Sequence, residues 1–395
     1  MRVLFLTDSL SDLDGVGRYA VRLLLAMERR RPELEFEVLL ARKHRPISAE
    51  VPARWKVSVG LPPDYFFYMS RPRFWASLTK SSLKIARAAR RADLVHAIKD
   101  YPHSLAGVLG ARFARRPCVA TAHGTYSVQP LLTKRHAELA RFMYRSLAGL
   151  VAVSRHTEAR LVSILGPTRP RRFVVIPNAV SAEHYAAAPE IGDRPWHAHP
   201  FTLSIGELKE RKGHHLAIEA WCRAAASRPD LHHFLVGKGS GDEYEAALRQ
   251  TIAASGLQDR IHLLGNVNES DKIDLLRRAE VFLHTPVTGR DGGFEGFGIV
   301  YLEAAACGVP SIGTRGSGAE DAIVDGETGL LVEPEAQAVS AALTSLLGDA
   351  ALRSRLGAGG LELARKSSWD ENARRVLALY DEVLGVDGVA PGLDA

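Results

Sequence analysis

Short apolar segments alternate with longer helical patterns along most of the 395-residue chain. One series starts with the apolar residues 3–6 and a helical pattern over 17–31, and a second series starts with the apolar residues 201–205. Strands that alternate with helices of this length predict parallel sheets that are covered by helices on both faces. Two separate series therefore predict an α/β protein made of two doubly wound domains.

The boundary between these domains is expected in the segment 186–200, which is rich in alanine and proline and has no helical or strand period. We expect an N-terminal domain over 1–190 and a C-terminal domain over 191–369. An amphipathic helix over 370–385 follows, and we expect it to pack back on the N-terminal domain. The residues after it have no periodic pattern, which predicts a disordered tail.

The composition is typical of a soluble globular protein, with 46% hydrophobic and 24% charged residues. The sequence contains no run of about 18 apolar residues of the kind that predicts a membrane-spanning helix. Its three cysteines, Cys118, Cys222 and Cys307, lie far apart, so neither a disulfide framework nor a zinc site is indicated. This pattern favours a reducing cytoplasm as the compartment.

Charge is distributed unequally along the chain. Residues 1–190 contain 31 Lys and Arg against 15 Asp and Glu, a net charge of +16, whereas residues 191–395 contain 20 against 30, a net charge of −10. Such an asymmetry indicates two domains with different partners. The basic half could face anionic lipid headgroups, nucleic acid or a phosphorylated acceptor, or could simply carry a solvated arginine-rich surface.

A helical stripe in the basic half leaves membrane and acceptor binding open. Lys80, Lys84, Arg87 and Arg91 share one helical face, and an aromatic and basic segment at 64–75 precedes them. Together they could lie on an anionic membrane or guide a lipid-linked acceptor. A solvated helix beside an aromatic core is the alternative, and nucleic-acid binding is not expected because no reader motif accompanies the charge.

The turns that follow the strands are the candidate sites, because ligands of open parallel sheets bind beyond the carboxyl ends of the strands. The turn after the first strand holds Gly15 and Gly17 directly before a helix, where backbone N–H groups can approach an anion. A flexible loop with a helix cap is the alternative. Asp12 and Asp14 in this turn form a DxD pair, which some transferases use to hold a divalent metal, but such pairs are common in polar loops and we expect no metal.

A second candidate turn follows the strand at 201–205. Gly206 ends this strand, and Lys209, Arg211 and Lys212 lie between it and the next helical pattern. A phosphate placed there would meet both the positive side chains and the N–H groups of the helix start. A charged surface loop is the alternative, and the absence of the pattern GxxxxGK[ST] excludes a P-loop nucleotide hydrolase.

The third candidate is a glycine-rich turn that carries two glutamates eight positions apart. Gly296 and Gly298 precede a helix that we expect to begin near Ile299, and its N–H groups form an anion site. Helical side chains lean toward the N-terminus, so the carboxylate of Glu303 reaches back toward this site. A carboxylate beside a phosphate makes sense when it accepts hydrogen bonds from a diol. We therefore expect a nucleotide or sugar nucleotide, with its phosphate on the glycines, its ribose on Glu303 and a second polyol on Glu295.

These residues match a known family. The stretch "FEGFGIVYLEAAACGVPSIGT" resembles the glutamate-x7-glutamate signature of the retaining glycosyltransferases of family 4, also called glycosyl transferases group 1. "LSIGELKERKGHH", "TAHGTY" and "VIPNAV" resemble further blocks of that family, and the resemblance extends over nearly the whole chain. It implies the GT-B fold, in which two Rossmann-like domains face each other across a cleft, with the acceptor on the N-terminal side and the nucleotide sugar on the C-terminal domain.

The resemblance also implies roles by position. Lys212 would neutralise the leaving diphosphate, Glu295 would hold the donor sugar, and His123 would lie near the reacting centre. Glu207 departs from the family pattern, which often has an arginine there, so Lys209 or Arg211 would have to supply that charge. The expected donor-binding residues are Gly15, Gly17, Gly206, Lys209, Arg211, Lys212, Asn266, Val267, Glu295, Gly296, Phe297, Gly298, Ile299 and Glu303.

The implied function is a retaining, metal-independent glycosyltransferase, and specifically a hexosyltransferase, without cofactor. It would move a sugar from a UDP- or GDP-sugar to a glycan or lipid-linked acceptor in cell-surface polysaccharide or glycolipid synthesis. We expect the enzyme in the cytoplasm, with peripheral attachment to the inner face of the membrane as an open extension. A sugar-nucleotide epimerase of the same broad fold and a non-catalytic sugar-nucleotide or membrane-binding module are the alternatives.

Overall fold

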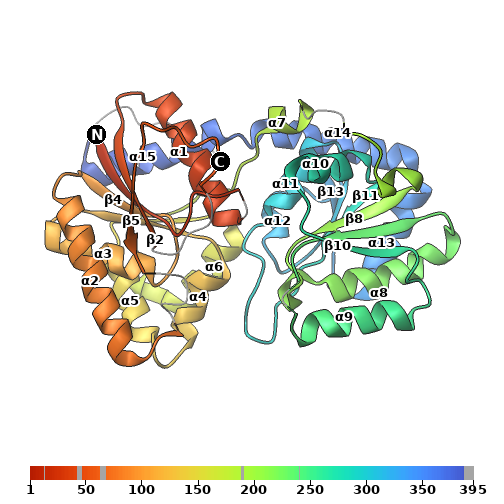
Figure 1. The fold of residues 1–395 in the computed structure, drawn as a ribbon, viewed down its shortest axis with the longest axis horizontal. Helices are drawn as coiled ribbons and strands as arrows, with labels where there is room; N and C mark the ends of the chain where they lie inside the picture. The colour runs from red at the N-terminus through yellow and green to blue at the C-terminus, as the bar shows by residue number, and fades with distance from the viewer. Residues whose placement is uncertain (13, 42–46, 63–67, 188–190, 240, 387–395) are drawn as a thin grey trace. The chain divides into compact units, whose positions relative to one another are not determined.

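The computed structural model describes residues 1–12, 14–41, 47–62, 68–187, 191–239 and 241–386. Contacts divide the chain into two compact units (Figure 1). Unit 1 consists of Met1–Asn178 and Trp369–Ala395, and unit 2 consists of Ala179–Ser368.

The division falls at Asn178, before the boundary that the sequence predicts at residue 190. The reason is the short helix α7 (Ala182–Ala186), which packs against helices of unit 2 although it precedes the proline- and alanine-rich segment. Part of that segment, residues 188–190, and the predicted tail after residue 386 lie outside the described residues.

Unit 1 is built on a seven-stranded parallel sheet with the strand order β3-β2-β1-β4-β5-β6-β7. Its central strands are buried on both faces, as expected for a sheet between two layers of helices. The sequence pattern did not single out β3, which lies at the edge of the sheet and is only partly buried. The strands are β1 (Arg2–Leu6), β2 (Glu35–Ala41), β3 (Lys56–Leu61), β4 (Leu94–Ala97), β5 (Cys118–Ala122), β6 (Gly149–Ala152) and β7 (Phe173–Val175).

The helices of unit 1 pack in pairs, α2 against α3 and α1 against α15. Polar caps define two of their starts: Asp14 Oδ1 accepts from the N–H of Gly17 at 2.6 Å, and Ser154 Oγ accepts from that of Thr157 at 2.9 Å. The helices are α1 (Gly15–Arg30), α2 (Arg71–Ala89), α3 (His103–Ala114), α4 (Thr125–Leu132), α5 (Ala137–Ser146), α6 (Arg155–Leu165), the 3-10 helix η2 (Gly166–Thr168) and α15 (Trp369–Leu384).

Unit 2 repeats this topology in a six-stranded parallel sheet with the order β10-β9-β8-β11-β12-β13. In both units the chain moves outward from a central strand in one direction and then returns to continue in the other. The predicted pair of doubly wound, Rossmann-like domains is thereby confirmed. The strands are β8 (Phe201–Ile205), β9 (His232–Val236), β10 (Ile261–Gly265), β11 (Val281–Leu283), β12 (Ser311–Thr314) and β13 (Gly329–Val332).

Helices cover both faces of the unit 2 sheet: α8 and α13 lie on one face, and α10 and α11 on the other (Figure 1). A hydrophobic cluster on the first face includes Trp221, Ile218 and Leu343. Besides α7, the helices are η3 (Pro195–Ala198), η4 (Glu210–Lys212), α8 (His214–Ala224), η5 (Ala225–Ser227), α9 (Glu243–Ala254), α10 (Glu269–Arg278), α11 (Ile299–Ala306), α12 (Ala319–Ala322), α13 (Ala336–Gly348) and α14 (Ala350–Lys366).

The topology points to one place in each sheet. The strand order reverses between β1 and β4 in unit 1 and between β8 and β11 in unit 2. Ligands of doubly wound sheets bind beyond the carboxyl ends of the strands at such a switch point. Among the described helices, none is long and apolar enough to cross a membrane.

Candidate active site

At the switch point of unit 2, three predicted residues meet around one carboxylate. Lys212, in the turn after β8, donates to Glu295 Oε2, in the loop after β11. Arg211 lies beside it, with its guanidinium 3.7 Å from the same oxygen. Residues from two separate turns thus form one cationic cluster in which two positive charges face one negative charge.

His284, which the sequence analysis did not select, completes this cluster. It directly follows β11, its Nε2 lies 3.4 Å from Glu295 Oε2, and its backbone carbonyl accepts a 2.7 Å hydrogen bond from the Tyr301 hydroxyl. Burial lowers the pKa of His284, so the ring is neutral near pH 7. Its position directly after a strand was the signal that could have identified it.

The ionisation of Glu295 is set by its neighbours. Burial acts to raise the pKa of this carboxyl, but Lys212, His284 and Arg211 together hold that pKa well below its usual range. Glu295 is therefore a fixed negative charge that keeps the lysine in place. A diphosphate that approaches the cluster would meet Lys212 and Arg211 already oriented by this anchor.

One glycine allows the turn after β8 to pack this closely. It is not Gly206, because a Cβ there would make only ordinary van der Waals contact, 3.4 Å from the Lys212 side chain and 3.6 Å from the His284 ring. Gly213 has φ +68°, and a Cβ there would lie 1.6 Å from the carbonyl oxygen of Thr285, so only glycine fits. The backbone conformation that brings Lys212 to Glu295 thus depends on Gly213, which the sequence presents only as a loop glycine.

Gly318 packs against the glycine-rich turn before α11. The Glu295 carbonyl accepts a 3.0 Å hydrogen bond from the N–H of Gly318, and a Cβ on Gly318 would lie 2.4 Å from the Gly296 backbone. Gly298, with φ +83°, caps α11, which begins at Ile299 as predicted. The first N–H groups of a helix have no partner within the helix, and its positive end attracts anions. This geometry suits the predicted phosphate site.

Glu303 lies one turn into α11 and is almost fully buried. Its Oε1 lies 3.2 Å from Lys272 Nζ on α10, so a second lysine holds the second glutamate. Lys272 was not predicted, because it stands 31 positions away in an ordinary amphipathic helix and no motif marks it. Each of the two predicted glutamates in unit 2 is therefore paired with a lysine.

Other predicted donor residues lie apart from these pairs. Lys209 lies 2.7 Å from Glu207, and both side chains are exposed. Because Lys209 pairs with Glu207, Arg211 is the second positive charge beside Glu295. Asn266 and Val267 follow β10 and precede the α10 cap Asn268, at the carboxyl edge of the same sheet. Their predicted contact with the base stays a prediction.

The first turn of unit 1 is shaped by packing. A Cβ on Gly17 would lie 2.4 Å from Ser9 Oγ and 2.7 Å from the Ser11 carbonyl oxygen, whereas one on Gly15 would meet nothing within 4 Å. Asp14 caps α1 and accepts a 2.7 Å hydrogen bond from the Ser9 hydroxyl. Asp14 thus has a structural role in this turn, and so does Gly17. The predicted contact of Gly15 and Gly17 with the donor remains a prediction.

His123 follows β5 and is fixed in orientation. Its Nε2 donates to the Ile98 carbonyl at 2.8 Å, so Nδ1 carries the lone pair, and burial lowers the pKa of the ring. Its backbone N–H donates to Asp100 Oδ1 at 3.2 Å. A neutral imidazole with one nitrogen committed to a backbone carbonyl is suited to accept a hydrogen bond at the other.

An ion pair that the sequence did not indicate spans the switch point of unit 1. Lys99 follows β4, Asp8 follows β1, and their charged groups lie 2.8 Å apart in a largely buried position. Asp100 beside them also accepts a hydrogen bond from Ser127. The only available signal was that Asp8, Lys99 and Asp100 each lie two or three positions after the end of a strand.

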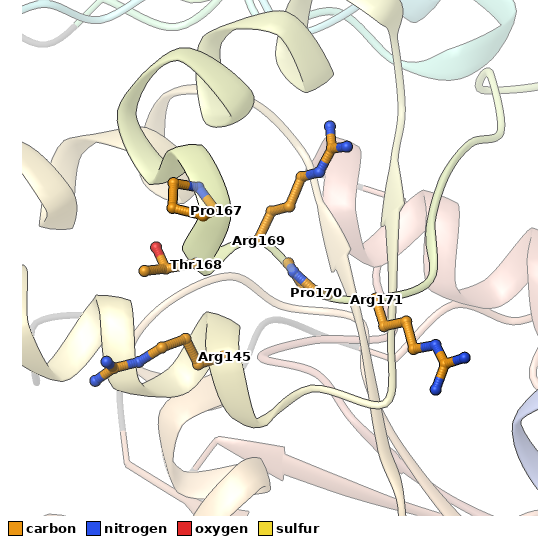
Figure 2. Close-up of a pocket in the computed structure, with 6 residues that line it drawn as sticks. All are labelled: Arg145, Pro167, Thr168, Arg169, Pro170 and Arg171. Atoms are coloured by element: carbon orange, nitrogen blue, oxygen red, sulfur yellow. The ribbon is translucent and has the colours of Figure 1, made fainter.

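Within the described residues, no group of three or more His, Cys, Asp and Glu side chains is arranged to hold a metal ion. A basic pocket of about 590 Å³ lies in unit 1 and contains no predicted site residue. Its three guanidinium groups point in different directions (Figure 2). Its lining residues come just before β6 and β7 in the sequence, at the amino ends of these strands. Ligands of such sheets bind at the carboxyl ends, so we place the candidate site there instead. Its lining residues are Arg145, Pro167, Thr168, Arg169, Pro170 and Arg171.

Two family models match the chain. The model described as Glycosyl transferases group 1 matches residues 195–362, and the model described as Glycosyltransferase Family 4 matches residues 13–184. The group 1 model includes the site residues of unit 2, from Gly206 to Glu303. The family 4 model includes Gly15, Gly17 and His123 in unit 1.

Curated relatives span most of the chain. The phosphatidyl-myo-inositol mannosyltransferase of Mycobacterium leprae is 28% identical over 293 residues, which cover 74% of each protein. A GDP-mannose-dependent monoacylated alpha-(1-6)-phosphatidylinositol monomannoside mannosyltransferase of Corynebacterium glutamicum is 33% identical over 240 residues, which cover 58% of this chain and 60% of that enzyme.

Solved structures show the same fold. The Anabaena protein HepE in complex with UDP and glucose superposes with a TM-score of 0.75 at 20% identity, over 97% of this chain and 100% of that one. Sucrose-phosphate synthase from Thermosynechococcus elongatus gives a TM-score of 0.75 at 20% identity, over 98% of this chain and 100% of that one. At this level of identity the similarity concerns the fold alone.

Proposed function

The chain belongs to the glycosyltransferases of group 1 and family 4, and from this premise we propose that it transfers mannose from GDP-mannose to a phosphatidylinositol-based glycolipid. The reaction proceeds with retention and without a metal. The names of the curated relatives support this donor and acceptor. A UDP-sugar is the second candidate donor, because HepE is bound to UDP.

The observation that carries the proposal is the cluster of Lys212, Arg211 and Glu295 at the unit 2 switch point. When the sugar leaves its nucleoside diphosphate, the bond from the sugar to the phosphate oxygen breaks and negative charge develops on that oxygen. Lys212, Arg211 and the N-terminus of α11 offset this charge without reorganising, because Glu295 already fixes the lysine. Glu303 holds the ribose hydroxyls one helical turn away.

A transfer assay tests the proposal against its alternatives. The protein is incubated with labelled GDP-mannose or UDP-glucose and vesicles that contain phosphatidylinositol, and lipid and aqueous phases are separated. We expect label in the lipid phase with GDP-mannose, and its loss in Lys212→Ala. Interconverted free donor would show an epimerase instead, and donor binding without turnover would show a non-catalytic module.

We further propose that the protein works in the cytoplasm and attaches to the inner face of a membrane through α2. This helix contains no acidic residue, carries Lys80 and Arg87, and exposes Trp75 by 50% and Leu83 by 58%. Basic residues combined with exposed apolar side chains favour anionic interfaces. Cosedimentation with phosphatidylglycerol vesicles should fall in the double variant Trp75→Ala, Leu83→Ala. Undiminished cosedimentation would remove α2 from the membrane contact.

A further inference from the structure

Lys272 lies between oxygen atoms from three helices. Its Nζ is 3.2 Å from Glu303 Oε1 on α11, 3.0 Å from Glu269 Oε1 on α10 and 3.3 Å from the Tyr185 hydroxyl on α7. The ammonium donates hydrogen bonds to Glu303 and Tyr185 and forms an ion pair with Glu269. The Tyr185 ring also lies against it, with its centroid 5.6 Å from Nζ.

The pair of Lys272 and Glu303 is buried on both sides. The lysine side chain is 8% exposed and the glutamate side chain 2%. An isolated charge at such a position is strongly disfavoured, so the nearby ammonium stabilises the Glu303 carboxylate there. Loss of the ammonium would remove the positive charge that holds this carboxylate in position, and Glu303 would become a poorer acceptor for a hydroxyl group.

The location of Lys272 joins two parts of the candidate site. Glu269 is the first residue of α10, directly after the loop of Asn266 and Val267 that is predicted to meet the base. The same ammonium lies 3.2 Å from Glu303, which is predicted to hold the ribose. Lys212, by contrast, belongs to the cluster on Glu295 and serves the diphosphate.

We propose that Lys272 is a positioning residue for the nucleoside half of the donor. It keeps Glu303 ionised and aimed at the ribose hydroxyls, and it fixes the start of α10 beside the base. Its ammonium already pairs with Glu303 and Glu269 within the protein, so we expect it to act through these carboxylates rather than by direct contact with phosphate. This inference rests on the proposed function, since it assumes that a nucleotide sugar is the donor.

Calorimetry with two probes separates this role from general support of the fold. GDP contains the nucleoside, whereas inorganic pyrophosphate contains only the part that Lys212 would bind. In Lys272→Met we expect GDP affinity to fall about tenfold or more, as for loss of a charged hydrogen-bond acceptor, while pyrophosphate affinity stays within about twofold. Lys272→Arg keeps the charge and should recover most of the GDP affinity.

Arg278→Gln is the matched control, because it removes an exposed ion pair with Asp274 from the same helix. Its GDP and pyrophosphate affinities should equal those of the wild type. If Lys272→Met does not fold, Tyr185→Phe removes one oxygen from the ammonium and should weaken GDP binding about two- to threefold with no change for pyrophosphate. In transfer assays the donor KM should rise in the lysine variant while kcat stays within about threefold.

Two results would overturn the inference. Equal losses for GDP and pyrophosphate would show that Lys272 only supports the structure, and unchanged GDP affinity would show that it has no role in binding. A wild-type protein that binds neither GDP nor UDP, although it binds pyrophosphate, would instead refute the nucleotide-sugar function itself, and the inference would fall with it.

Discussion

The two units share one strand order but use its switch point differently. In unit 1 the strand ends β1 and β4 are joined by the ion pair of Asp8 and Lys99, beside a turn closed by packing and a helix cap. In unit 2 the ends of β8 and β11 bring Lys212 to Glu295, and α10 adds Lys272 to Glu303. The strand order shared by the two units determines where a site lies, and the loops after the strands determine which charged side chains it contains.

Lowering the pH should reduce the stability of unit 2 more than that of unit 1. Burial lowers the pKa of His96 in unit 1, and of His214 and His233 in unit 2, to about 3. Below pH 6.5 these histidines become protonated in the unfolded chain but stay neutral in the folded protein. The free energy of unfolding therefore falls as the pH decreases toward the pKa of the folded state. At pH 5 each ring lowers it by about 2 kcal/mol.

Hydrogen exchange at pH 7 and pH 5, corrected for intrinsic rates, measures this difference. Peptides from β9 in unit 2 should lose more protection than peptides from β5 in unit 1. Equal losses in the two sheets, or an unchanged β9, would contradict the pKa directions on which the expectation rests.

Removing a lysine should have different effects in the two units. Lys212→Ala removes a preorganised cation from the departing diphosphate, and we expect kcat to fall about 10²- to 10³-fold with a smaller change in donor affinity. Lys99→Ala in unit 1 leaves Asp8 without its ammonium partner and should lower stability more than turnover. Steady-state kinetics and urea unfolding compare the two variants, and an unchanged kcat in Lys212→Ala would remove this lysine from the mechanism.

Glu303→Ala should weaken nucleotide binding. The buried ribose hydroxyls would lose a charged acceptor, at a cost of about 1.5–3 kcal/mol in donor affinity. Calorimetry with GDP measures this loss, and Glu320→Ala is a control because that carboxylate caps the exposed turn at Gly316. Donor affinity equal to that of the wild type would exclude the ribose role.

The smallest expected effects distinguish two neighbouring glycines in unit 1. Gly17→Ala would place a Cβ against Ser9 and Ser11 and should destabilise the protein by about 1–3 kcal/mol. Gly15→Ala meets open space and should change stability by less than about 0.5 kcal/mol. Thermal unfolding of both variants measures the difference, and similar melting temperatures would show that packing does not require Gly17.

The comparison also shows what a sequence can predict. The two sheets and the start of α11 at Ile299 followed from periodicity, and Glu295 and Glu303 from an eight-residue spacing on one turn and helix. The lysines of the buried pairs were harder to predict. Lys212 lies in a recognisable turn, whereas no motif marks Lys272 or Lys99. Their partners are 83, 31 and 91 positions away, respectively. Only tertiary packing brings such pairs together, and no local pattern encodes it.

The edge strand β3 and the position of α7 were missed for a related reason. Most residues of the edge strand β3 are exposed or only partly buried, without a regular alternation, which gives a weak pattern. Helix α7 has five residues, and its membership of unit 2 depends on contacts with α11 and, through Tyr185, with Lys272. Short elements carry too little periodicity to reveal the unit to which they belong.

We infer that unit 2 binds a nucleoside diphosphate with two glutamates that lysines hold in place, and a crystal structure of the complex with GDP checks this inference. We expect the ribose hydroxyls within hydrogen-bond distance of Glu303, and the diphosphate beside Lys212 and the first N–H groups of α11. A nucleotide bound elsewhere, or a Glu303 that contacts only Lys272 in the complex, would contradict it.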